Sequence, residues 1–524
     1  MSASSPVGVN LAKSKIASGE GDRLPGRETG YFETDHLLDN LHGRAFRGGL
    51  VTLIGQAARL VLQVLSAAVL GRLLLPRDFG LLAMVASVTG FVGMFKDLGL
   101  SNATIQRPQI THGQISALFW INCALGVGVT LLVASLAPCI AWFYHEPKLL
   151  WITLMLSVNF IFSGLTVQHQ ALLRRQMQFK KTAIISVVSM ACGVATAILM
   201  AVLGFRYWSL VGAEFGASII NCVLVWTSCH WRPGAFKRRV GVGPMLSFGG
   251  HLTGFTLLNY LTRNFDNILV GRVLGPAPLG IYTRAYGLLM LPISQVNAPL
   301  AAVLLPGLSR LQNNPPEYRK LFLRAVGGMS FVTVPIVIFS SFFAHDVILL
   351  WLGPHWLAVA RIFQLLAPAA TVGAMVFAPN WLSQSLGRPA QQFRYALIAA
   401  PVCITGFVIG IRWGLEGVAT SFSVTFVGLL WAYVWYATKN SPVRFFDVLV
   451  SFLSALIPAC IAGVMTWALR WTVLPDASAL IVLAVCGPIF TILCFSIAML
   501  SKNSRSLVFE AARAFSALAF RRGN

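Results

Sequence analysis

The chain has 524 residues, of which 56% are hydrophobic and only 11% are charged, and its mean hydropathy is +0.73. Because soluble domains carry about 25% charged residues, this composition excludes an ordinary soluble protein. The apolar residues come in repeated stretches of about 20, each long enough to cross about 30 Å of hydrocarbon, whereas a β-barrel would show short alternating segments. We therefore expect an all-α polytopic membrane protein.

Fourteen membrane-spanning helices are predicted after a polar N-terminal tail. Residues 1–45 are mixed in charge and lack an apolar core, so we expect a mostly disordered cytoplasmic tail with a short helix around 35–41. The spans are expected at 48–71, 79–101, 115–141, 149–170, 182–204, 208–230, 245–271, 279–305, 321–345, 360–385, 392–411, 415–437, 447–469 and 478–500. Because fourteen is an even number, both termini lie on one side.

The distribution of basic residues indicates which side that is. With both termini in the cytoplasm, the cytoplasmic segments hold 29 of the 40 Lys and Arg residues and the external loops hold 8, as the positive-inside rule requires. The net charge of +23, which in a soluble protein would suggest nucleic acid, is therefore a consequence of topology, and no nucleic-acid partner is expected. The external segments are short loops, and the longest lies around 346–358.

The sequence shows no sign of catalytic or cofactor chemistry. The 9 cysteines are scattered without a C-x-x-C pair, so neither disulfides nor structural zinc are expected. Motifs for ATP binding, dinucleotide binding, zinc hydrolysis and serine hydrolysis are missing. We expect no metal, no cofactor and no catalytic residue, and therefore a protein that is not an enzyme.

An internal repeat divides the chain into similar halves. Residues 71–80 match residues 271–280 at an offset of 200, with two glycines, one arginine and one proline in common. Parallel repeats of this kind occur in transporters, where the substrate site lies between the halves. The expected units are an N-lobe (46–242), a C-lobe (243–440), two additional spans (441–501) and a basic cytoplasmic tail (502–524).

The first span of each half carries a polar stripe. Gln56, Arg59 and Gln63 follow steps of three and four residues, which places them on one helix face. The stripe of the seventh span consists of Thr256, Asn259, Arg263 and Asp266. Two such stripes facing each other would line a polar cavity between the halves.

Charges at membrane depth cost roughly 2.5–3.5 kcal/mol each and normally face a cavity or a partner. Arg59 has no acid nearby in its own helix, which favours a hydrated cationic cavity where a guanidinium binds phosphate oxygens. For Arg263 and Arg284, a phosphate site and a structural role such as an Arg263–Asp266 ion pair are both open. Asp266 is the better candidate for a structural role.

Glu214 lies between Gly212 and Gly216 in the sixth span. The G-x-x-x-G spacing predicts close helix packing. Two roles are open for the carboxylate: it carries a coupling proton, or it caps or pairs at the outer interface. Asp266 is a weaker candidate for ion coupling.

Four segments resemble those of a known family. Residues 70–81 (LGRLLLPRDFGL) resemble the first-hairpin motif of Wzx-type polysaccharide flippases, and residues 96–106 (KDLGLSNATIQ) resemble the end of that family's second span. Residues 263–271 (RNFDNILVG) and 279–286 (LGIYTRAY) are similar to its signature in spans seven and eight. The similarity extends over residues 45 to 440 and points to the colanic-acid exporter branch of the multidrug/oligosaccharidyl-lipid/polysaccharide exporter superfamily.

The resemblance implies two six-helix lobes arranged in a V and a location in the bacterial cell inner membrane. It implies a flippase that translocates undecaprenyl-pyrophosphate-linked oligosaccharide repeat units for exopolysaccharide biosynthesis, by alternating access. The implied partners are this lipid-linked oligosaccharide, membrane lipids, and the polymerase and chain-length regulator of the same pathway. Arg59 and Arg263 would bind the pyrophosphate, and the neutral polar residues of the stripes would contact sugar hydroxyls.

Two other functions are weighed against this one. A cation-coupled drug antiporter of the same superfamily would need acidic rather than basic cavity residues. A polymerase or ligase of the same pathway would need a large external loop, and the external segments here are short.

Overall fold

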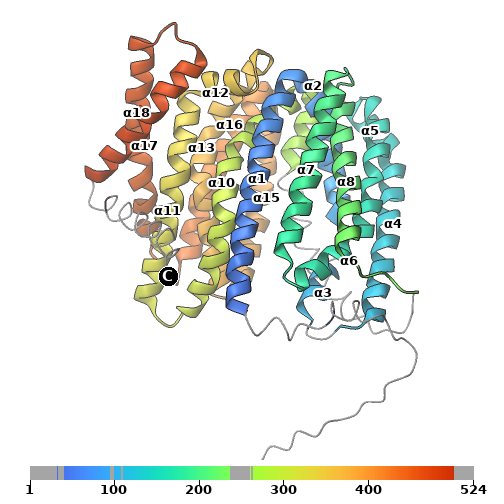
Figure 1. Cartoon of the computed structure of the whole chain (residues 1–524). Helices are drawn as coiled ribbons and strands as arrows, with labels where there is room; N and C mark the ends of the chain where they lie inside the picture. The colour runs from blue at the N-terminus through green and yellow to red at the C-terminus, as the bar shows by residue number, and fades with distance from the viewer. Residues whose placement is uncertain are drawn as a thin grey trace, which may run out of the picture.

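The structure is a computed structural model, and it describes residues 32, 41–94, 100–107, 110–235, 260, 264–500 and 505. Within these ranges all regular structure is helical. The long helices stand side by side with their turns at two opposite ends (Figure 1). Ten helical stretches are long and apolar enough to cross a membrane. The predicted class, an all-α polytopic membrane protein, is confirmed.

The described residues of the first half form eight helices. They are α1 (Leu41–Leu73), α2 (Pro76–Gly93), α3 (Leu100–Gln106), α4 (His112–Tyr144), α5 (Lys148–Ser157), α6 (Asn159–Arg175), α7 (Phe179–Val202) and α8 (Trp208–Ser228). Helix α1 lies against α7, where the Gly55 backbone is so close to Ala183 that a Cβ atom on Gly55 would lie 3.0 Å from the Ala183 Cβ atom.

In the described part of the second half, the first continuous helix covers 264–274. The chain continues with α10 (Pro276–Arg310), α11 (Pro315–Phe342), α12 (Ala344–Trp351), α13 (Leu357–Gly373), α14 (Phe377–Ser385), α15 (Pro389–Gly410), α16 (Gly414–Thr438), α17 (Phe445–Val473) and α18 (Ala479–Leu500). Most of the predicted N-terminal and C-terminal tails, including the predicted helix at 35–41, lies outside the described residues, as do Thr256, Asn259 and Arg263.

Proline and capping side chains fix several helix starts. Pro76 and Pro276 occupy the first position of α2 and α10, where the missing N–H is no loss and the fixed φ suits a helix. Thr111 caps α4 by accepting a hydrogen bond from the Gln114 N–H, and the Gln114 side chain accepts from the Thr111 N–H in return. The same proline thus begins the second helix of each repeat.

Two of the predicted spans are interrupted helices. The span expected at 149–170 consists of α5 and α6, which meet at Val158, and the span expected at 360–385 consists of α13 and α14, joined by a single 3-10 turn over Ala374–Val376. The Ser157 carbonyl at the first break accepts a hydrogen bond from the Thr130 hydroxyl at 2.9 Å. A side chain of α4 thereby satisfies a backbone group near the break, as buried backbone in a membrane requires.

The prediction of a loop at 346–358 is wrong. This segment contains most of α12 and a 3-10 turn over Pro354–Trp356. Trp356 is fully buried and donates from its ring nitrogen to the Gly71 carbonyl at 2.6 Å. Because Ile348 and Leu352 are buried as well, the segment folds as a helix that packs against α1 instead of remaining in solvent.

The G-x-x-x-G spacing around Glu214 does mark close packing. A Cβ atom on Gly212 would collide with the Met200 side chain, and one on Gly216 would lie 2.7 Å from the Thr196 hydroxyl oxygen. The predicted close contact is therefore confirmed, and its partner is the neighbouring helix α7.

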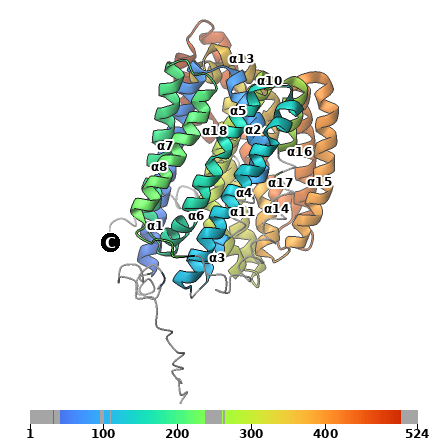
Figure 2. The same cartoon turned by 90° about the vertical axis from the view of Figure 1, so that its right-hand side faces the viewer.

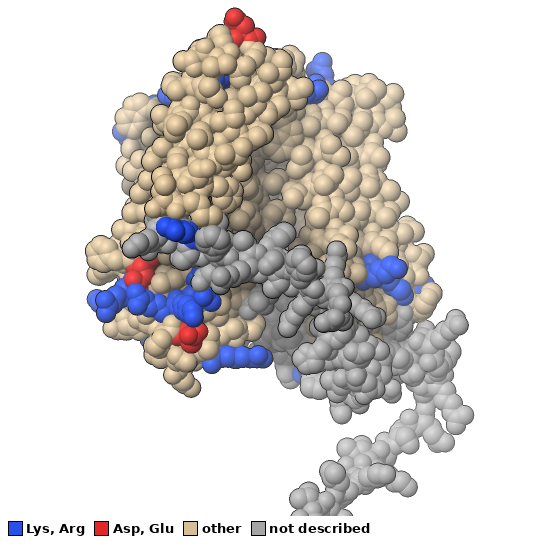
Figure 3. Space-filling view, turned by 60° about the vertical axis from the view of Figure 1, so that its left-hand side comes forward, with Lys and Arg blue, Asp and Glu red and all other residues tan. Residues whose placement is uncertain are grey.

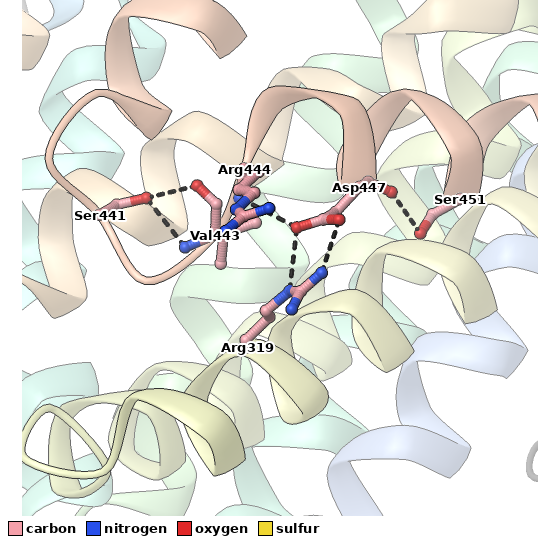
Figure 4. Close-up of polar contacts among 6 residues, drawn as sticks. All are labelled: Arg319, Ser441, Val443, Arg444, Asp447 and Ser451. Carbon is pink, nitrogen blue, oxygen red and sulfur yellow. Dashed lines mark hydrogen bonds and ion pairs between the residues drawn. The ribbon is translucent and has the colours of Figure 1, made fainter.

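Helix α17 is joined to α11 near one end and to α12 near the other. The Arg319 guanidinium donates two hydrogen bonds to Asp447, at 2.9 and 2.7 Å, and Asp447 also accepts from the Arg444 N–H at 3.1 Å (Figure 4). At the other end of α17, Arg470 donates to Asp346 of α12 at 2.9 Å. Helix α17 is thus fixed to α11 and α12 by ion pairs.

Candidate functional site

The two halves of the chain cross at one end of the molecule. The first turn of α2 lies against the first turn of α10, and a Cβ atom on Gly80 would overlap the Pro276 carbonyl oxygen. The contact is reciprocal, because a Cβ atom on Gly280 would overlap the Pro76 carbonyl oxygen. These four residues belong to the segments that match at an offset of 200. The internal repeat therefore brings two copies of one motif together, and only glycine fits at the crossing.

Side chains of the second half add to this closed end. Trp351 donates to the Val64 carbonyl at 3.1 Å, and Arg72 donates to the Leu350 carbonyl at 2.7 Å. Together with the bond from Trp356 to Gly71, these contacts join α12 and the turn after it to the upper part of α1 (Figure 1). We refer to this set of contacts, with the Gly80–Gly280 crossing, as the latch.

Arg284 belongs to the latch in this structure. Its guanidinium carbon lies 3.8 Å from the centre of the Phe79 ring, a cation–π contact between the halves. Phe79 in turn meets Trp356 edge to face at 5.3 Å. Of the two roles left open for Arg284, the observed contact is the structural one.

Asp266 also makes structural contacts. It is 4% exposed, and its carboxylate accepts from the Tyr282 hydroxyl at 2.8 Å and from the Asn267 N–H at 2.8 Å. The carboxylate therefore fastens the helix over 264–274 to α10. Its predicted ion-pair partner Arg263 lies outside the described residues.

Beyond the latch, Tyr260 of the second half still contacts α2, where its hydroxyl donates to the Ala86 carbonyl at 3.0 Å. Figure 3 shows a hollow on one face of the molecule, and most Lys and Arg residues visible on this face lie near the end opposite the latch. Gln56, Arg59 and Gln63 on α1 are exposed, and none has a hydrogen bond or ion pair to another described residue. The binding role of this stripe stays a prediction, and Thr256, Asn259 and Arg263 of the matching stripe lie outside the described residues.

Two adjoining cavities lie inside the first half, with volumes of about 440 and 410 Å³. They lie among α2, α3, α5, α6 and α8. These helices are labelled in Figures 1 and 2. Asn159, Phe160 and Glu214 line both cavities. Glu214 therefore lies where the two cavities meet, and we refer to the pair as the N-lobe pocket.

The lining of the N-lobe pocket comes from polar faces of two helices. Helix α6 contributes Asn159, Ser163, Thr166, Gln170 and Arg174, and helix α8 contributes Glu214, Ser218 and Asn221. The two faces are linked by a hydrogen bond from the Gln170 amide nitrogen to the Asn221 amide oxygen at 3.4 Å. Each set follows steps of three and four residues, a helical spacing.

Sequence reasoning singled out only Glu214 from this set. The signal that could have found the others was the regular spacing of polar residues within two apolar spans. This signal is weak because, among these residues, Arg174 is the one with a charge. The break between α5 and α6 adds a second signal, since interrupted helices form binding sites in transporters and Asn159 is the first residue after the break.

The chain is thus a helical membrane protein whose two halves share a motif and are joined at one end. The fold matches that of the "Lipid II flippase MurJ, inward closed conformation" with a TM-score of 0.68 at 14% identity, over 88% of this chain and 100% of that one.

The chain belongs to the family described as "Polysaccharide biosynthesis protein", whose model matches residues 69–361. It is 24% identical over 390 residues to the "Lipopolysaccharide biosynthesis protein WzxC" of Escherichia coli (strain K12), which is 73% of this chain and 78% of that protein. It is also 24% identical over 350 residues to the "Succinoglycan biosynthesis transport protein ExoT" of Rhizobium meliloti (strain 1021), covering 66% and 70% of the two chains. The predicted resemblance to Wzx-type flippases is confirmed.

Proposed function

We propose that this protein is a flippase that moves undecaprenyl-pyrophosphate-linked oligosaccharide repeat units across the membrane for polysaccharide biosynthesis. The observation that carries the proposal is the latch, where two copies of one motif seal the halves at one end of the molecule, together with the hollow on the face that Figure 3 shows. The names of the relatives, a polysaccharide biosynthesis protein and a biosynthesis transport protein, support the choice of substrate. The substrate crosses intact, so no covalent step by this chain is needed.

We further propose fourteen membrane crossings, with both termini in the cytoplasm of a bacterial inner membrane and the latch on the external side. The 29 Lys and Arg residues in the proposed cytoplasmic segments, against 8 in the external ones, support this orientation. The basic side chains near the end opposite the latch in Figure 3 agree with it. The moving units are the N-lobe (46–242) and the C-lobe (243–440), and 441–501 moves with the C-lobe because ion pairs hold α17 to it.

The transport cycle follows from these contacts. The head group enters from the cytoplasmic side, Arg59 and Arg263 bind its pyrophosphate, and the prenyl chain stays in lipid. The sugars meet neutral polar side chains of the two stripes, namely Gln56, Gln63, Thr256 and Asn259. The latch then opens, which separates Gly80 from Gly280 and breaks the stacking of Arg284 on Phe79. The exported unit passes to a polymerase and a chain-length regulator.

A cation-coupled drug antiporter remains the alternative, and the position of Glu214 gives it specific support. Among the described residues that line the N-lobe pocket, Glu214 is the one acid. One carboxylate suits coupling to an ion or proton, and it serves a lipid flippase equally well. The exposed Arg59 suits an anionic substrate and not a cationic drug, so the flippase is the better-supported function.

A strain that lacks the gene tests this function. Lipid-linked oligosaccharide should accumulate in the cytoplasmic leaflet of that strain and return to the external leaflet when the gene is supplied on a plasmid. An unchanged distribution between leaflets, together with greater sensitivity to cationic drugs, would favour the antiporter instead.

A further inference from the structure

The polar lining of the N-lobe pocket is unusual for its place among membrane helices. A second cavity of the same volume, about 440 Å³, lies between α11 and α18 and is lined largely by apolar side chains such as Phe331, Phe339 and Phe490. The N-lobe pocket instead gathers amides, hydroxyls and two charges. Polar groups at membrane depth are costly unless they have a function. The larger cavity of the N-lobe pocket and this apolar cavity have the same volume but different linings. The difference indicates that the polar lining serves a ligand.

We infer that the N-lobe pocket, lined by Asn159, Ser163, Gln170, Glu214 and Asn221, is the subsite that binds sugar rings of the transported substrate. The inference rests on the proposed function and deepens it. The sequence analysis assigned the sugars to the stripes of the first and seventh spans, whereas the pocket lies between α2, α6 and α8.

The chemistry of the lining suits a sugar. Amide and hydroxyl side chains both donate and accept hydrogen bonds, as the hydroxyl groups of a sugar also do. Phe160 and Phe162 add apolar surface for the C–H faces of a ring. Each cavity lies within the range of about 300–1,000 Å³ found for small-molecule sites, which combine apolar surface with a few placed polar groups.

The charges of the lining argue against a phosphate at this place. Among the described residues of the pocket, Arg174 is the one base and Glu214 the one acid, so the pocket as a whole is close to neutral. Glu214 occupies the junction of the cavities, where it would repel a pyrophosphate. The exposed Arg59 on α1 has no such acid beside it. The pyrophosphate and the sugars of the head group therefore have separate sites.

Unsatisfied polar atoms also point to a ligand. The amide oxygen of Asn159 is buried and has no hydrogen-bond partner among the described residues. The bond between Gln170 and Asn221, at 3.4 Å, lies beyond the usual 2.7–3.2 Å range. A buried polar atom without a partner is costly, and a sugar hydroxyl would supply the missing partner for Asn159.

The pocket also adjoins a contact between the halves. The Tyr260 hydroxyl donates to the carbonyls of Ala86 and Ser87 at 3.0 and 3.2 Å, and Ala86 lines the smaller cavity. A sugar in that cavity would therefore lie next to a residue of the second half. Its position allows the bound substrate to influence the contact between the lobes.

Binding measurements on the purified full-length protein with two ligands test the inference. One ligand is the lipid-linked oligosaccharide extracted from membranes of the deletion strain, and the other is undecaprenyl pyrophosphate without sugars. The test variants are Gln170→Met and Asn221→Leu, which remove hydrogen-bonding groups at similar volume. The matched control is Gln364→Met on α13, because Gln364 is exposed and bonds only to the Ser341 carbonyl.

We expect each test variant to bind the sugar-bearing lipid about tenfold more weakly and the sugar-free lipid as well as the unsubstituted protein does. An unchanged melting temperature in detergent shows that the variant is folded, and Ser163→Ala replaces any variant that fails this check. Equal losses for both ligands, or no loss for either, would overturn the sugar site and leave the flippase function standing. If the unsubstituted protein binds neither ligand, the proposed function fails and the sugar site fails with it.

Discussion

Arg59 is the residue on which the proposed phosphate site depends. It lies on α1, is exposed, and has no acidic partner among the described residues. Charge-assisted hydrogen bonds contribute about 1.5–3 kcal/mol each, so Arg59→Ala should reduce export by about one to two orders of magnitude. Arg59→Lys should restore only part of the activity, because lysine keeps the charge but not the bidentate geometry. Export is measured as polysaccharide at the cell surface.

Arg77 provides the matched control for this substitution. It is a surface residue whose side chain is 54% exposed and pairs with Glu146 at 2.8 Å, an interaction of the kind that contributes about 0–1 kcal/mol. Arg77→Ala should leave export nearly unchanged. If Arg59→Ala inserts normally and exports as well as Arg77→Ala does, the phosphate must bind elsewhere.

Glu214 offers a second test at the residue scale. Its carboxylate lies at the junction of the two cavities, and a coupling proton would have to bind there. If it does, Glu214→Gln should lower export by about tenfold or more while the protein still inserts, and the remaining export should no longer depend on the proton gradient. Export that stays fully gradient-dependent in Glu214→Gln would leave the carboxylate with a binding or packing role only.

At the scale of helices, the crossing of α2 and α10 should control whether the external end can close. A valine at position 280 would place its Cβ atom on the Pro76 carbonyl oxygen, whereas a Cβ atom at position 287 of the same helix meets nothing within 4 Å. Gly280→Val should therefore keep the latch open and abolish export, and Gly287→Val should do neither.

Spin labels can measure this opening. Arg206 and Arg412 are exposed residues in the turns before α8 and α16, at corresponding places in the two halves. With labels at both positions, the mean distance in Gly280→Val should be longer than in the unsubstituted protein and in Gly287→Val. Identical distance distributions in the two valine variants would show that the crossing does not set the closed state.

The two ion pairs of α17 should differ in their contribution to stability. The Asp346 and Arg470 side chains are 6% and 19% exposed, and those of Asp447 and Arg319 are 17% and 46% exposed. Asp346→Ala leaves a mostly buried guanidinium without its carboxylate and should cost about 3 kcal/mol. Asp447→Ala should lower the free energy of unfolding by about 1 kcal/mol. The melting temperature of this variant in detergent should therefore fall less than that of Asp346→Ala. Equal melting temperatures would contradict this ranking.

The helical class and the repeat could be predicted from the sequence, but the breaks and the pocket could not. Long apolar stretches can be read directly from the sequence. The same holds for the glycine and proline residues that recur in the second half at one fixed spacing from those of the first half. Hydropathy averages over whole spans, so it passes over Val158, where α5 gives way to α6. Hydropathy also predicts a loop at 346–358, because the ends of this segment are polar. Ile348 and Trp356 are buried, however, and their burial orders the segment.

The N-lobe pocket could not be predicted from the sequence for a different reason. Gln170 and Asn221 are 51 positions apart and meet only because α6 packs beside α8. An isolated charge in an apolar span is a clear signal in the sequence, whereas a neutral amide is not. Of the residues predicted for the site, Glu214 does line a cavity, and Arg284 and Asp266 make structural contacts instead.

At the scale of the whole molecule, the proposed orientation predicts which residues a water-soluble reagent can reach. In a background without the 9 native cysteines, a cysteine at His355 should react from the external side, and a cysteine at Arg521 should react only after the membrane is made permeable. His355 is exposed in the 3-10 turn after α12. Labelling of both positions from the same side would end the model of fourteen crossings.

The central claim is that this chain alone moves a lipid-linked oligosaccharide from one leaflet to the other. Purified protein reconstituted in liposomes that carry the substrate in both leaflets tests it most directly, with a glycosidase outside as the probe of external sugars. Liposomes with the protein should lose nearly all of their substrate to the enzyme. Liposomes without protein, or with Gly280→Val, should keep about half, because the inner leaflet stays protected. Equal protection with and without the protein would contradict the account.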